Sequence, residues 1–109
     1  MVRGKKGLNG YREPIYTPYV QHCLRFYSRY LHIKDFRNDT DKLNWYACHR
    51  AIQAYSPTDQ DILVYVYGER DTLADNVYNV SIKYGIHQDF VWEMMREFER
   101  KVAVERGLV

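Results

Sequence analysis

The residues best suited to chemistry follow Tyr84-Gly85-Ile86, where a helical pattern resumes with polar and aromatic side chains. Side-chain amides and carboxylates can hydrogen-bond to the edges of bases, and cations close to them can contact phosphates. A tight glycine turn between two helices is a common way to present such a helix to DNA. The residues that we assign to this DNA-contacting face are Lys83, His87, Gln88, Asp89, Trp92, Glu93, Arg96 and Arg100.

Two adjacent pairs of residues are candidates for metal binding, His22 with Cys23 and Cys48 with His49. Zinc binds Cys and His side chains, but adjacent residues on a helix point about 100° apart and converge poorly on one ion. Both cysteines also fall within an apolar pattern, where a free cysteine behaves as a small hydrophobic residue. We therefore expect packed cysteines and neither a metal nor another cofactor.

Catalytic motifs are missing from the sequence. It contains no phosphate-binding glycine loop, no dinucleotide-binding turn and no nucleophile elbow. The many acidic residues lie mostly at helix starts, where capping and the helix dipole explain them. Two cysteines do not form a secreted disulfide framework, and no apolar run suits a signal peptide or a membrane span. We expect a cytoplasmic protein that is not an enzyme and does not contact a membrane.

Charge is distributed unevenly along the chain, although the net charge is only +2. Residues 1–42 contain nine Lys and Arg and four acidic residues, whereas residues 43–109 contain seven and ten. Glycines and prolines interrupt any periodicity in residues 1–17, which predicts a flexible basic arm. The arm either follows DNA phosphates or serves as a solubilising tail. Its basic residues are Arg3, Lys5, Lys6 and Arg12.

Apolar spacing predicts that these residues are positioned by a single all-α domain over residues 18–109. The predicted helices span 18–33, about 40–55, 57–68, 73–84 and 87–106. Ser56 before Pro57 is a strong helix start, Asp39 or Thr40 can cap the second helix, and Thr72 or Asp71 can cap the fourth. Gly85 suits the left-handed residue that ends the fourth helix.

The same spacing predicts which side chains face the core. On the first helix they are Tyr19, Val20, Cys23, Leu24, Tyr27, Tyr30 and Leu31, and on the second Leu43, Tyr46, Ala47, Ala51, Ala54 and Tyr55. On the third and fourth helices they are Ile62, Leu63, Tyr65, Val66, Tyr67, Leu73, Val77, Val80 and Tyr84. On the last helix they are Val91, Met94, Met95, Phe98 and Val102.

Three segments in this order resemble region four of bacterial sigma factors: the opening helix at 56–68, the turn and recognition helix at 84–94, and the basic pair with its apolar residue at 100–102. Small sigma-like activators of phages and mobile elements share this plan. The resemblance covers residues 56–102 and implies a helix-turn-helix within 56–106. It also implies a recognition helix over 87–106 in the major groove of double-stranded DNA, and RNA polymerase as a further partner. The family's recognition helix begins with arginines, where this chain has Gln88, Asp89 and Glu93.

Two hypotheses for the function follow, and a plain helical bundle with a glycine turn is the structural alternative to both. The favoured hypothesis is a small DNA-binding transcription regulator. The alternative is a protein-interaction module or a mobile-element-encoded inhibitor that uses the acidic, aromatic face of the last helix. Joint exposure of Phe90 and Trp92 would favour a protein partner. Their burial, with Gln88, Arg96 and Arg100 facing outward, would favour DNA. The tyrosine-rich first helix is compatible with a homodimer, which a two-fold DNA reader would need.

Overall fold

The computed structural model describes residues 12–109, which form five α-helices and no strand. The helices are α1 (Thr17–Arg29), α2 (Asp39–Ile52), α3 (Pro57–Gly68), α4 (Leu73–Tyr84) and α5 (Gln88–Glu105). The predicted all-α class and the order of five helices are therefore confirmed for the described part of the chain.

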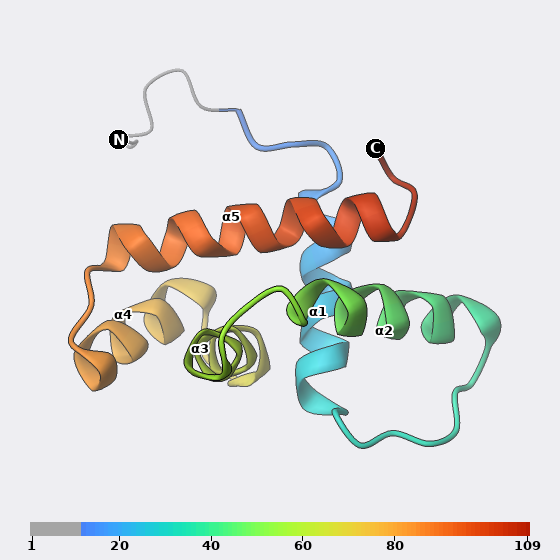
Figure 1. Cartoon of the computed structure of the whole chain (residues 1–109), viewed down its shortest axis with the longest axis horizontal. Helices are drawn as coiled ribbons and strands as arrows, with labels where there is room; N and C mark the ends of the chain where they lie inside the picture. Colours follow the sequence, from blue (N-terminus) through green and yellow to red (C-terminus); the bar gives the residue numbers. More distant parts are fainter. Residues whose placement is uncertain (1–11) are drawn as a thin grey trace.

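Helix α1 is the centre of the packing, because it contacts α2, α3 and α5. Val20, Cys23 and Leu24 on α1 are at most 2% exposed, which places one face of this helix inside the core. Helix α5 runs along one side of the molecule and crosses α1, with α3 and α4 beneath its N-terminal half (Figure 1). It contacts α1, α2 and α4, so it joins both halves of the chain.

The predicted helix starts at α3 and α4 are confirmed. The Ser56 hydroxyl accepts a hydrogen bond from the backbone N–H of Asp59 at 3.2 Å, and the Thr72 hydroxyl accepts one from Asp75 at 3.1 Å. Gly85 ends α4 with φ 63°, a left-handed conformation that a side chain would strain. These signals are local, which explains why sequence spacing locates them well.

The first helix ends at Arg29, and the prediction that it continues to residue 33 was wrong. The carbonyl oxygen of Tyr30 accepts a hydrogen bond from the Trp45 indole at 3.0 Å, and the Arg29 guanidinium donates to the carbonyl of Gly68. The residues at the end of α1 are therefore held by hydrogen bonds to α2 and α3, and the helix does not continue past Arg29. The second helix begins after Asn38, whose side chain caps it in place of Asp39 or Thr40, and it ends at residue 52.

The inward face of α2 differs from the predicted one. Leu43 and Tyr46 are 54% and 41% exposed, whereas Asn44, Trp45 and Cys48 are buried. Asn44 is satisfied inside the protein because it shares hydrogen bonds with the Tyr19 hydroxyl and accepts one from Arg106. A polar residue thus occupies a core position on α2. The buried face of this helix therefore differs from the face that its apolar residues alone would predict. Of the residues predicted to face inward from the first helix, Tyr19 on α1 and Tyr30 and Leu31 just after it are likewise exposed.

The predicted inward face of α5 is confirmed, since all five apolar positions are at most 7% exposed. Glu99 is also buried there, at 5% exposed. Its carboxylate accepts hydrogen bonds from Tyr67 on α3 at 2.6 Å and from Gln21 on α1 at 3.1 Å. Burial raises the pKa of Glu99, and the two hydrogen bonds oppose that shift. This carboxylate therefore links three helices through polar contacts in the core.

Asn76 on α4 fixes the end of α3. It is fully buried, and its amide nitrogen donates to the carbonyl oxygens of Val66, Glu69 and Asp71 at 2.9–3.4 Å. Carbonyls at the end of a helix lack partners within the helix, so this amide satisfies the buried carbonyl of Val66 and also binds two carbonyls of the loop that follows α3. The contact orients α4, and through it the start of α5.

Candidate functional site

The corner between α4 and α5 is built by a three-residue connection, residues 85–87. The N–H of Ile86 donates to the carbonyl of Ser81 at 3.1 Å, and Ile86 packs against the core while half-buried. His87 then caps α5, with its Nδ1 accepting from the N–H of Asp89 at 3.2 Å. The turn is therefore held by the glycine, by an apolar anchor and by a helix cap.

Most of the predicted contact residues of α5 lie on one outward face. Trp92 is the exception, because it is half-buried against the core. Lys83 on α4 is exposed, and its ammonium lies 5.5–6.0 Å from the ring centres of Tyr65 and Tyr84. The predicted arm residues Arg3, Lys5 and Lys6 lie outside the described residues. The exposed predicted residues are Arg12, Lys83, His87, Gln88, Asp89, Glu93, Arg96 and Arg100.

Charge changes along the outward face of α5. Asp89 and Glu93 lie on its first two turns, whereas Arg96 and Arg100 follow one and two turns later. The positive end of the helix dipole thus has acidic neighbours, which stabilises the helix but repels phosphates at that end. Phosphate contact by this helix is therefore favoured at its middle, around the two arginines.

The described start of the chain lies beside the middle of α5. Figure 1 shows the segment before α1 on the outer side of α5. Both Glu13 and Arg96 lie close enough to Glu99 to affect its pKa, the first raising it and the second lowering it. Arg12 is exposed and directly precedes Glu13, so the basic N-terminal sequence enters the described fold close to α5. Sequence spacing did not predict this proximity between the basic N-terminal sequence and α5.

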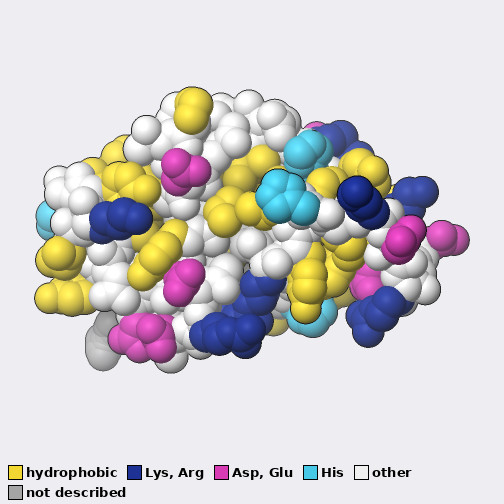
Figure 2. Space-filling view, turned by 90° about the horizontal axis from the view of Figure 1, so that it is seen from below, with side chains coloured by type: hydrophobic (Ala, Val, Ile, Leu, Met, Phe, Trp, Pro, Cys, Tyr) yellow, Lys and Arg dark blue, Asp and Glu magenta, His cyan; other side chains and the backbone are white. Residues whose placement is uncertain are grey.

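Cations on the opposite side of the molecule do not form a continuous surface. In Figure 2, which views the molecule from the side away from α5, Lys and Arg side chains lie among acidic and apolar ones. This face is therefore a poorer candidate for following a phosphate backbone than the arginine-bearing part of α5.

The two aromatic residues at the start of α5 differ in exposure, so the pair matches neither hypothesis fully. Phe90 is 54% exposed, while Trp92 is half-buried against the core. The structure thus exposes one aromatic side chain next to Asp89 and Glu93. It does not present the pair together.

The cysteines are packed, as expected. Cys23 and Cys48 are at most 2% exposed and not disulfide-bonded, and burial raises the pKa of the Cys23 thiol to about 11 and that of Cys48 further. Within residues 12–109 no three His, Cys, Asp or Glu side chains are grouped so that they could hold a metal ion. Thiols that stay protonated at neutral pH are poor nucleophiles and poor metal ligands.

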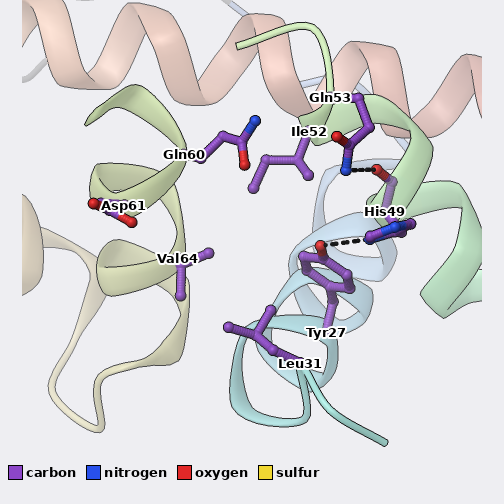
Figure 3. Close-up of a pocket in the computed structure, with 8 residues that line it drawn as sticks. All are labelled: Tyr27, Leu31, His49, Ile52, Gln53, Gln60, Asp61 and Val64. Atoms are coloured by element: carbon purple, nitrogen blue, oxygen red, sulfur yellow. Dashed lines mark hydrogen bonds between the residues drawn. The ribbon is translucent and has the colours of Figure 1, made fainter. Parts of the chain in front are cut away.

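A groove that sequence reasoning missed lies between α3 and the C-terminal ends of α1 and α2. Its volume is about 290 Å³, and Figure 3 shows side chains from all three helices turned toward it. The Tyr27 hydroxyl and His49 Nδ1 are 3.1 Å apart at one wall, and the imidazole stacks on Trp45 with ring centres 4.9 Å apart. The lining residues are distant in sequence, so no local motif could have indicated the groove.

Comparisons with family models, curated proteins and solved structures found no match for this chain. No helix in the described range is long and apolar enough to cross a membrane.

Proposed function

We propose that this protein is a small DNA-binding regulator that uses α4, the turn at Gly85 and α5 as a helix-turn-helix. The observation that carries the proposal is the geometry of this corner. A left-handed glycine and a half-buried apolar anchor lead into a helix whose outer face is free of other described helices. Such a helix can enter a major groove, where Gln88 would read adenine and Glu93 would accept from cytosine.

The phosphate contacts in this proposal come from Arg96, Arg100 and the N-terminal sequence. Arg12 directly precedes Glu13, which lies near Glu99 of α5, and the sequence before it contains Arg3, Lys5 and Lys6. Cations at these positions would offset the acidic start of α5, because phosphate contacts supply most of the sequence-independent affinity. The resemblance to sigma region four makes RNA polymerase a further proposed partner.

The test is a salt titration of binding to random duplex DNA by fluorescence anisotropy. We expect affinity to fall steeply between about 50 and 200 mM salt. The double variant Arg96→Ala, Arg100→Ala should lower the slope of log affinity against log salt by about 2, since each lost phosphate contact removes about 0.9. Arg70→Ala, in the exposed loop before α4, is the matched control and should leave the slope unchanged. Absence of binding at the lowest salt would refute the proposal.

A second candidate function rests on the exposure of Phe90. An exposed aromatic ring next to Asp89 and Glu93 is typical of a protein-binding surface with a complementary basic partner. This candidate predicts that the immobilised protein retains a protein partner, that Phe90→Ala abolishes retention, and that Tyr78→Ala does not. Tyr78 is equally exposed, at 54%, so it controls for the loss of an exposed aromatic side chain. Equal retention by both variants would exclude the Phe90 surface.

A further inference from the structure

The groove between α1, α2 and α3 is lined by groups that accept hydrogen bonds. Asp61 and Gln60 come from α3 and Gln53 directly follows α2, and the groove contains no lining Lys or Arg (Figure 3). Asp61 is exposed and makes no ion pair or hydrogen bond with any described residue. One carboxylate at the groove is therefore available to a cation from outside.

The two glutamine side chains are oriented by the backbone. The amide nitrogen of Gln53 donates to the carbonyl of His49 at 3.1 Å, and that of Gln60 donates to the carbonyl of Tyr55 at 2.9 Å. Neither amide oxygen accepts a hydrogen bond within residues 12–109. The Gln60 amide oxygen and the Asp61 carboxylate on α3, and the Gln53 amide oxygen at the end of α2, are therefore acceptors that a hydrogen-bond donor in the groove could use (Figure 3).

Three of the other lining residues are apolar, and Tyr27 and His49, which hydrogen-bond to each other, complete the lining. Ile52 is 3% exposed, Val64 is half-buried and Leu31 is 37% exposed. A ligand that fits must therefore combine an apolar stem with a cationic, donor-rich end. Lysine and arginine side chains both have this form. Arginine fits better, because its guanidinium is planar, weakly hydrated and able to donate two parallel hydrogen bonds to a carboxylate.

We propose that this groove binds an arginine side chain of a partner protein, with the guanidinium on Asp61 and the aliphatic stem against Val64 and Ile52. We choose a cationic side chain because of charge complementarity, since the lining includes a carboxylate and two amide oxygens and contains no Lys or Arg. No residue of α4 or α5 lines the groove. The site is therefore separate from the proposed DNA-binding face, and a DNA-bound molecule could use it at the same time.

The test is an NMR titration of the full-length protein with N-acetyl-arginine amide. N-acetyl-norleucine amide, which keeps an aliphatic stem without the charge, is the control ligand. We expect saturable shifts of the Gln53 and Gln60 side-chain amides and of Val64 with the arginine compound only. Asp61→Asn should weaken binding by about fivefold, as expected for a partly exposed charge-assisted contact. Asp75→Asn, at an exposed acid on α4, is the matched variant and should bind like the parent protein.

Three results would overturn the proposal. These are shifts that do not saturate, equal binding of the norleucine compound, and equal affinity of the Asp61→Asn and Asp75→Asn variants. Both replaced side chains are exposed, so each variant should retain the dispersed spectrum of the folded protein. Gln60→Leu provides a second test, because it removes an acceptor and keeps the charge. This variant should bind the arginine compound more weakly and the norleucine compound no more tightly. An unchanged affinity for the arginine compound would count against Gln60 as an acceptor in the groove.

Discussion

Replacing Tyr67 with phenylalanine tests whether the buried carboxylate of Glu99 stabilises the packing of α1, α3 and α5. Tyr67 is fully buried, and its hydroxyl donates to Glu99 at 2.6 Å. The ring itself is unchanged in Tyr67→Phe, so the contact with Phe98 should persist. The loss is one hydrogen bond to a charged group, which contributes roughly 1.5–3 kcal/mol. We expect the free energy of unfolding to fall by about 2 kcal/mol at neutral pH.

The pH dependence provides the stricter part of this test. Burial raises the folded-state pKa of Glu99 above its usual 4.5, whereas the hydrogen bond from Tyr67 lowers it. The stability associated with protonated Glu99 is therefore fully present below the unfolded-state pKa and is lost as pH rises through the folded-state pKa. In Tyr67→Phe that folded-state pKa is higher still, so the cost of ionisation at neutral pH is larger. The deficit should shrink to about 1 kcal/mol at acidic pH, where only a neutral hydrogen bond is lost.

Urea unfolding followed by circular dichroism, at neutral and at acidic pH, measures both quantities. Tyr78→Phe is the control, because Tyr78 is 54% exposed and its variant should stay within about 0.5 kcal/mol of the parent. A deficit below about 0.5 kcal/mol at neutral pH would show that the Tyr67–Glu99 hydrogen bond contributes little. A deficit that grows on acidification would contradict the role assigned to the Tyr67 hydroxyl, which is to stabilise the ionised carboxylate and so to lower the pKa of Glu99.

Three further changes test other parts of the fold. Gly85→Ala should lower the free energy of unfolding in urea by about 1 kcal/mol, because φ is 63° at this position and a new Cβ would contact no other atom that could compensate. An unchanged free energy of unfolding would contradict the need for glycine at this turn. Asn76→Ala should lower the free energy of unfolding by about 2 kcal/mol, because the carbonyls that the Asn76 amide binds lose their partner. An unchanged free energy of unfolding would show that water takes the place of the amide. Cys23 and Cys48 should react with a thiol reagent far more slowly in the folded protein than in urea, and equal rates would refute their burial.

Local signals explain which parts of the fold could be predicted. The starts at Ser56 and Thr72 and the end at Gly85 each depend on residues within one turn of the helix, and the structure has all three. The buried face of α5 was also predictable, because its apolar residues recur at regular helical spacing and the helix packs along its whole length. The DNA-binding role that we assigned to the outer face of α5 stays a prediction.

The sequence by itself determined the all-α class, the helix order and the capped turn, because these depend on interactions between residues close along the chain. The tertiary structure alone decided the positions of Asn44 and Glu99, since a polar residue enters the core only where distant partners satisfy it. It also decided that Glu13 lies beside α5 and that Asp61 lines a groove with residues of α1 and α2. Such proximities arise from the packing of helices that are far apart in sequence, and no local pattern encodes them.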